Sequence, residues 1–242
     1  TIAAPLGSLL GQHVGWRGAF FLVVPLALLA LVWQWIGMPA LPPAGARRSS
    51  NVFGLLRRRQ VALGMSAIFL FFMGQFSLFT YLRPFLETVT GVSIPALSAM
   101  LLLMGLAGVV GTWAIGRLLG ARLYSIVIAI PLVMALVAAA LIAFGSTPAA
   151  VAILLVGWGF FGTAAPVGWG TWLSRALRDD AEAGGGLQVA VIQFAITLGA
   201  ALGGLLFDAQ GWWSAFALAA GLLLASAVVA TVAALDTRQA AR

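Results

Sequence analysis

The sequence contains no cysteine, no lysine, a single histidine and only six acidic residues in 242 positions. The absence of cysteine excludes disulfide bonds, thiol chemistry and cysteine-based metal centres, and one histidine cannot form a histidine-rich metal site. No Asp or Glu lies within the long apolar stretches, which therefore lack the intramembrane carboxylates that usually carry protons. We expect no metal, no cofactor and no enzymatic activity.

What the sequence has in excess is apolar residues. They make up 62% of the chain, whereas charged residues make up only 8%, against roughly 25% in a soluble domain. Several apolar stretches of about 20 residues follow one another, and each is long enough to cross a hydrocarbon core of about 30 Å. Because every backbone polar group must be satisfied within lipid, these stretches are expected to be helices. The sequence predicts an all-α, polytopic transmembrane bundle.

Uninterrupted apolar length predicts seven full spans preceded by a short segment at residues 1–12. The predicted spans are 17–36, 61–83, 94–115, 124–144, 148–173, 187–207 and 212–234.

The arginines are confined to the gaps between these spans. Eleven of the thirteen lie in alternate gaps, 37–60, 116–123 and 174–186, and in the C-terminal tail. Because cytoplasmic loops carry an excess of basic residues, these regions are expected to face the cytoplasm of a bacterial inner membrane. No arginine patch is interleaved with aromatic residues, so the net charge of +7 does not indicate nucleic acid binding.

The gap at 37–60 has the composition of a linker, with three prolines and a Gly-Ala-Arg-Arg-Ser-Ser run. Its end, "NVFGLLRRR" at 51–59, is expected to be a short amphipathic segment on the inner membrane surface. A basic segment that fixes topology accounts for it, and a regulatory role is the alternative.

Residues 3–21 and 199–217 are similar to each other. Nine positions are identical at an offset of 196 residues, a distance that corresponds to six spans with their loops. Both copies run in the same direction across the membrane, and parallel halves of six spans characterise one transporter architecture. If the repeat unit is six spans, residues 1–12 are the end of a fifth span, and four spans precede Thr1.

Short motifs carry a resemblance to the major facilitator superfamily. The stretch "APLGSLLG" at 4–11 is similar to the end of the antiporter motif on the fifth helix, and "GWRGAFF" at 15–21 resembles the start of the sixth helix in the drug–proton antiporter branch. The stretch "GRLLGAR" at 116–122 resembles a decayed cytoplasmic loop motif that lacks the family's acid. The resemblance implies a remnant of the N-terminal half at 1–36, a cytoplasmic linker at 37–60 and a six-helix C-terminal half at 61–242.

Four longer stretches look like the corresponding parts of bacterial purine ribonucleoside efflux pumps. They are "APLGSLLGQHVGWRGAF", "IFLFFMGQFSLFTYLRPF", "PVGWGTWLSRAL" and "GGLQVAVIQFAITLGAALGG". The resemblance implies a monomeric transporter in a lipid bilayer that exports purine ribonucleosides, or purine analogues, in exchange for protons by alternating access. The proton carrier is then expected upstream of Thr1. An exporter of drugs or sugars is the alternative, and a non-transporting membrane scaffold or sensor is a more remote one.

In this family the substrate cavity lies near the midplane, lined here by 61–83, 94–115, 148–173 and 187–207. Gln75 and Phe79 share a helical face, and an amide in an apolar run must find a polar partner. Substrate contact and a helix–helix hydrogen bond are both open for Gln75. Trp169 is a candidate for stacking on a purine ring, whereas Trp172 is expected at the membrane interface.

Gln193 and Thr197 also lie four residues apart, and they complete the predicted substrate site. Pro166 predicts an ordinary kink or a hinge for rocking. Close helix packing, with a gating role as the alternative, is expected for two small-xxx-small pairs and one proline: Gly199 and Gly203, Gly7 and Gly11, and Pro5. Arg83 and Glu87 are spaced to form an exposed ion pair.

Overall fold

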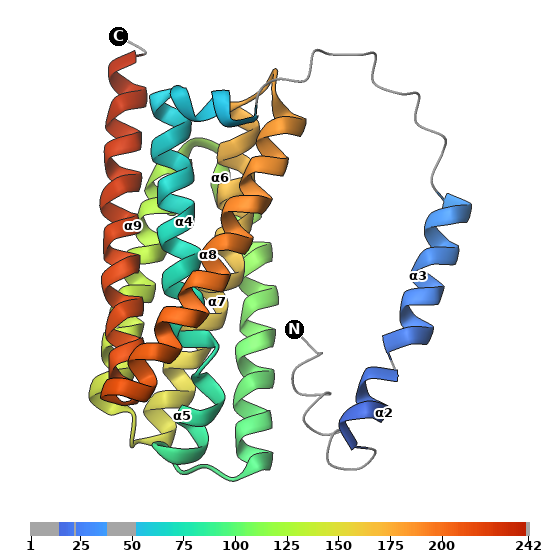
Figure 1. The fold of residues 1–242 in the computed structure, drawn as a ribbon, viewed down its shortest axis with the longest axis vertical. Coiled ribbons are helices and arrows are strands. Elements are labelled where there is room, and N and C mark those ends of the chain that lie inside the picture. Colours follow the sequence, from blue (N-terminus) through green and yellow to red (C-terminus); the bar gives the residue numbers. More distant parts are fainter. Residues whose placement is uncertain (1–14, 22, 38–51, 241–242) are drawn as a thin grey trace.

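The computed structural model describes residues 15–21, 23–37 and 52–240, which are almost entirely helical and contain no strand (Figure 1). The elements, in chain order, are α2 (Gly15–Phe21), α3 (Val23–Gly37), the 3₁₀-helix η1 (Val52–Arg57), α4 (Arg59–Phe79), α5 (Leu82–Thr88), α6 (Ile94–Phe144), α7 (Pro148–Ala176), α8 (Ala181–Gln210) and α9 (Trp212–Ala240).

Six helical segments of the described residues are long and apolar enough to cross a membrane. Each contains or closely matches one of the six spans predicted after residue 60, so the prediction of an all-α polytopic bundle is confirmed. The six segments are Arg59–Thr88, Ile94–Gly120, Arg122–Phe144, Pro148–Ala176, Ala181–Gln210 and Trp212–Thr237.

Within the predicted span at 17–36 the structure describes two helical pieces, α2 and α3, on either side of residue 22, which lies outside the described residues. Helix α3 is 15 residues long. That these pieces form one membrane span stays a prediction. Figure 1 shows α3 apart from the six-helix bundle, and none of its residues is buried.

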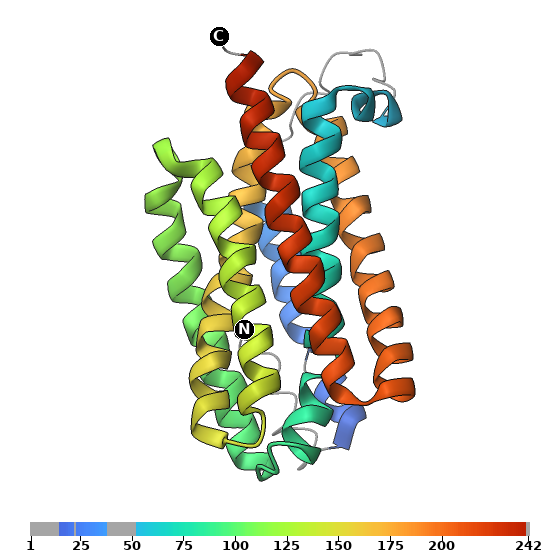
Figure 2. The same cartoon turned by 90° about the vertical axis from the view of Figure 1, so that its left-hand side faces the viewer.

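Helix α6 contains two of the membrane spans. Arg122 interrupts it with a non-helical backbone (φ −108°, ψ 19°), and the chain reverses direction at this point, so that the two segments stand side by side (Figure 2). The predicted gap at 116–123 is therefore a tight turn, and Arg117 lies on the first helical segment instead of in a loop.

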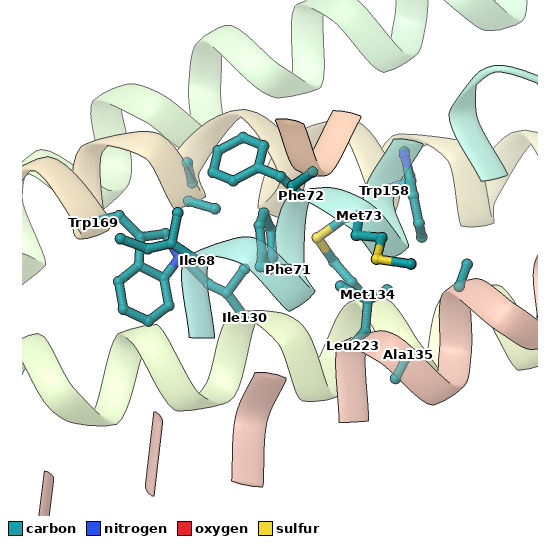
Figure 3. Close-up of a cluster of buried hydrophobic side chains, with 14 of the residues drawn as sticks. Ile68, Phe71, Phe72, Met73, Ile130, Met134, Ala135, Trp158, Trp169 and Leu223 are labelled. Atoms are coloured by element: carbon teal, nitrogen blue, oxygen red, sulfur yellow. The ribbon is translucent and has the colours of Figure 1, made fainter. Parts of the chain in front are cut away.

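The core of the bundle is built around α4. Ile68, Phe71 and Phe72 of this helix are buried and pack against α6, α7 and α9 (Figure 3). Helices α4 and α8 approach each other closely because α8 presents glycines. A Cβ on Gly199 would overlap the backbone carbonyl of Met73, and one on Gly203 would lie 2.7 Å from the carbonyl of Ser77.

One end of the bundle gathers the arginines, and we call it the arginine-rich end (residues 57–59, 117–122, 175–180 and 236–237). Arg58 forms an ion pair with Asp180 at 3.0 Å, and Arg59 forms one with Asp236 at 3.1 Å. These pairs join the start of α4 to α8 and α9. Within the "NVFGLLRRR" stretch, Val52–Arg57 form η1 at this end, and its expected position on the inner membrane surface stays a prediction.

The opposite end is held by aromatic packing and one exposed ion pair. Phe85 of α5 contacts the rings of Trp212 and Phe216 at centroid distances of 5.0 and 4.7 Å. Arg83 Nε donates to Glu87 Oε1 at 2.8 Å, which confirms the predicted pair.

Candidate substrate site

Gln75 lies near the middle of the span 59–88 and faces α7. Its Nε2 donates a long hydrogen bond to the carbonyl of Gly162 at 3.5 Å, while its Oε1 is buried and has no partner among the described residues. An unpaired buried acceptor costs about 1–3 kcal/mol. The amide is thus tied to α7 by one atom and retains an acceptor for another group.

Pro166 explains why the carbonyl of Gly162 is available to Gln75. A proline has no N–H, so it cannot donate to the carbonyl four residues earlier in the helix, which here belongs to Gly162. Within a membrane such a freed carbonyl must be satisfied by a neighbouring group. Gly162 also has no side chain, and a Cβ there would lie 2.9 Å from Gln75 Nε2. Helix α7 continues through Pro166 to Ala176.

Phe79 lies one turn beyond Gln75 and is 39% exposed. Its ring contacts Phe76 edge-on at 5.8 Å between centroids. This end of α4 therefore presents aromatic surface beside the Gln75 amide.

Trp169 is only 2% exposed and packs edge-on against Trp172 at 6.1 Å. Figure 3 shows it beside Ile68, within the core of the bundle. In this conformation its ring faces are covered, so stacking on a substrate would require α4 and α7 to separate locally.

Gln193 and Thr197 lie on an exposed face of α8. The Thr197 hydroxyl donates to the carbonyl of Gln193 at 2.9 Å, whereas the Gln193 side chain is directed to the surface. Phe194 beside it is 60% exposed, and its ring lies 6.0 Å from that of Phe69 on α4. Both polar residues are in the middle of a 30-residue helix, far from either end.

The predicted residues do not converge on one pocket among the described residues. Helices α4 and α8 run in the same direction, with Gly199 beside Met73 and Gly203 beside Ser77. This register places Gln193 about two helical turns nearer the arginine-rich end than Gln75. Gln75 and Phe79 form one group, and Gln193 and Thr197 form another.

A cavity of about 130 Å³ lies elsewhere, between the two segments of α6 and α7. We call it the α6–α7 groove. All ten residues around it are apolar, and none of the predicted site residues is among them. They include Gly111, Ala114, Leu118, Ile126, Phe160 and Ala164.

The family model of the Major Facilitator Superfamily matches residues 1–185, three quarters of the sequence. The chain belongs to the Major Facilitator Superfamily. This assignment confirms the family that the motifs indicated, and it agrees with the expectation that the chain is not an enzyme. It also supports the description of the chain as a multi-pass membrane protein.

Individual relatives in this superfamily carry two different descriptions. The chain is 54% identical over 94% of its length to the "Transcription regulatory protein OpdE" of Pseudomonas aeruginosa. It is 42% identical over 95% of its length to the "Purine ribonucleoside efflux pump NepI" of Salmonella paratyphi B and to that of Salmonella typhimurium. The chain spans 58% of the length of each of these relatives.

The glycines predicted for helix packing or gating on α8 lie at a contact between two helices. Gly199 and Gly203 lie against α4 of the same bundle, and the Tyr81 hydroxyl donates to the carbonyl of Ala200 at 2.9 Å between them. Close helix packing is their observed environment, and a gating role stays a prediction. Pro5, Gly7 and Gly11 lie outside the described residues.

Three aromatic residues have surroundings that the sequence did not predict. The rings of Phe69 on α4 and Phe194 on α8 contact each other. Phe194 directly follows Gln193 in the sequence, which could have signalled its part, whereas nothing near Gln193 in the sequence indicates Phe69. Trp172 is 1% exposed, so its ring is enclosed within the bundle. It lies near the end of α7, and its expected depth at the membrane interface stays a prediction. Its ring fills the space left by Gly64, where a Cβ would overlap it.

Proposed function

We propose that the chain is part of a secondary active transporter that exports purine ribonucleosides of the inosine and guanosine type, or purine analogues, by proton antiport with alternating access. Residues 61–242 would form one six-helix half, 1–36 would belong to the other half, and 37–60 would link them. The protein would act as a monomer in the bacterial inner membrane, with the arginine-rich end and the C-terminus in the cytoplasm.

The observation that carries this proposal is the exposed polar face of α8. An amide facing lipid at mid-depth would cost several kcal/mol, so Gln193 and Thr197 are expected to face a wet cavity or another polar surface. Gln75, with its unpaired Oε1, offers a second polar group on the neighbouring helix. Amides and hydroxyls suit a neutral, hydrogen-bonding solute such as a nucleoside, and the exposed rings of Phe79 and Phe194 suit its base.

The specific substrate is supported by the NepI relatives, whose name states purine ribonucleoside efflux. A drug or sugar exporter of the same fold would use the same face with different contacts. Acidic residues in the described part of the chain lie near helix ends or in loops, so the proton carrier is expected on a segment that precedes this sequence in the whole transporter.

The name of the OpdE relative supports a second candidate, a membrane sensor that regulates transcription. A sensor requires a ligand-dependent change of conformation but no net movement of solute across the membrane. Transport measurements therefore separate the two functions.

The test uses the full-length protein in inverted membrane vesicles with labelled inosine and an imposed pH gradient. Gradient-dependent uptake that excess guanosine suppresses is expected. Gln193→Ala should lower uptake about three- to tenfold, because a lost hydrogen bond to a neutral group is worth about 0.5–1.5 kcal/mol. Gln75→Ala is expected to act in the same direction.

Gln210→Ala is the matched control, because this exposed amide lies at the end of α8 and should leave uptake unchanged. Expression of all variants is compared by immunoblot. Uptake that ignores both the gradient and guanosine would overturn the transport proposal, and inosine-dependent gene expression without any uptake would favour the sensor.

A further inference from the structure

The α6–α7 groove lies outside the proposed substrate face. Figure 2 shows the first segment of α6 and α8 on opposite sides of the bundle, and the groove is formed where both α6 segments meet α7. The small side chains of Ala114 on one segment and Ala129 on the other help to form it, and Phe160 and Leu118 border it. Gly111 allows the first segment to contact the backbone of Phe160 on α7. The groove is partly open to the outside of the described bundle, so an apolar ligand can enter it.

The size and lining of the groove fit a short apolar group, such as part of a hydrocarbon chain. Its volume of about 130 Å³ is close to that of an engineered apolar cavity of about 150 Å³ in another protein that stays dry and binds benzene. A polar ligand would lose its hydrogen bonds there, because every lining side chain is apolar.

Two arginines, Arg117 and Arg122, lie where the groove meets the arginine-rich end of the bundle. Arg122 lies at the turn between the two segments of α6, four residues after Leu118 and four before Ile126, so it stands at the end of both segments that line the groove. Its side chain is exposed and forms no ion pair within the described residues. Arg117 is also exposed, and its guanidinium lies over the ring of Trp113 at 3.8 Å, which leaves its N–H groups available.

No acid of the described residues forms an ion pair with these two arginines. Asp180 and Asp236 are paired with Arg58 and Arg59, and the exposed Asp179 and Glu182 at the same end make no ion pair with Arg117 or Arg122. Arg175 adds a third positive charge close by, because its Nη2 donates to the carbonyl of Gly120 at 2.9 Å. An apolar groove with a positively charged end at the membrane surface matches the two parts of an anionic lipid.

We propose that the α6–α7 groove seats part of one acyl chain of an anionic phospholipid, whose phosphate is bound by Arg117 and Arg122. Guanidinium groups bind phosphate oxygens through paired N–H donors, and anionic lipids are concentrated in the cytoplasmic leaflet. A zwitterionic lipid would offer the same chain with no net charge, so the site should discriminate between the two.

The experiment titrates full-length protein in neutral detergent with phosphatidylglycerol or phosphatidylcholine of identical acyl chains, and bound lipid is counted by native mass spectrometry. Phosphatidylglycerol should bind more tightly. The double variant Arg117→Gln/Arg122→Gln should weaken its binding about thirtyfold, from a factor of about five for each arginine near the surface. The control Arg57→Gln/Arg178→Gln removes the same charge from the same end and should change binding less than threefold.

Two further arms test the groove itself. Ala114→Phe fills the groove and should also abolish tight binding, whereas Ala99→Phe, at an exposed position of the same α6 segment, should not. Glycerol phosphate, which has the head group without acyl chains, should not compete. Equal affinity for both lipids, an unaffected Ala114→Phe variant, or full competition by glycerol phosphate would each overturn the proposal.

Discussion

Helices α4 and α8 lie side by side and cross the bundle in the same direction, yet they are buried to very different extents. In the most apolar 18-residue stretch of each span, 61% of residues are buried for α4 with α5, but only 17% for α8. Each helix carries a glutamine in its membrane-spanning part. Gln75 contacts the carbonyl of Gly162 on α7, whereas Gln193 is exposed.

We interpret this difference as the difference between a structural helix and the helix that carries the proposed substrate face. Helix α4 contacts its neighbours on several sides, so its substitutions are expected to act on stability first. Helix α8 contacts α4 through Gly199 and Gly203, which we call the glycine stripe. Its opposite face is open, so substitutions on that face are expected to act on transport. The expected effect of a substitution therefore depends more on the side of the helix on which the residue lies than on the residue type.

The largest expected effect comes from removing a large side chain from α4. Phe71 is 0% exposed, and Phe71→Ala should lower the free energy of unfolding by about 3 kcal/mol, because the packing contacts of the ring are lost and a cavity remains. Phe194→Ala on the open face of α8 should lower it by only about 0.5 kcal/mol, through its ring contact with Phe69. Unfolding of the two full-length variants in mixed micelles measures both free energies. Equal decreases for Phe71→Ala and Phe194→Ala would contradict the proposed difference between α4 and α8.

An intermediate effect is expected where the two helices touch. Gly199→Ala places a Cβ against the carbonyl of Met73, and the backbone shift needed to relieve this overlap should cost about 1–3 kcal/mol. Gly186→Ala on the same helix meets nothing within 4 Å and should be neutral or stabilising by up to about 1 kcal/mol, since alanine favours helix. The same unfolding measurement applies, and a destabilised Gly186→Ala variant would show that the glycine stripe is not the cause.

The sequence was sufficient for the features that depend on local pattern. Apolar length located the six spans after residue 60, and the alternation of arginines predicted that residues such as Arg58, Arg122 and Arg175 would share one end of the bundle. The spacing of Arg83 and Glu87 predicted their ion pair. Each of these depends on residues close together in the chain or on a period that the membrane imposes.

Contacts between residues that are far apart in the sequence could not be predicted from local patterns. Pro166 was identified as a break in the helix, but the partner of the freed Gly162 carbonyl, Gln75, lies 87 positions away in the sequence. Likewise Trp172 is buried because Gly64 leaves room for its ring, a pairing that residue preferences do not reveal.

The smallest expected effect concerns the ion pair that joins the ends of α4 and α8. Arg58 and Asp180 lie 3.0 Å apart, with 58% and 19% of their side chains exposed, and such exposed pairs contribute about 0.2–1 kcal/mol. Arg58→Gln should therefore lower the unfolding free energy by less than about 1 kcal/mol, and the difference should fade as salt rises, because ions screen exposed charges. Arg57→Gln controls for the loss of charge, since Arg57 forms no ion pair among the described residues. If Arg57→Gln destabilises as much as Arg58→Gln, or if the loss persists at about 1 M salt, this contact does not hold α8 to α4, and their packing depends on the glycine stripe alone.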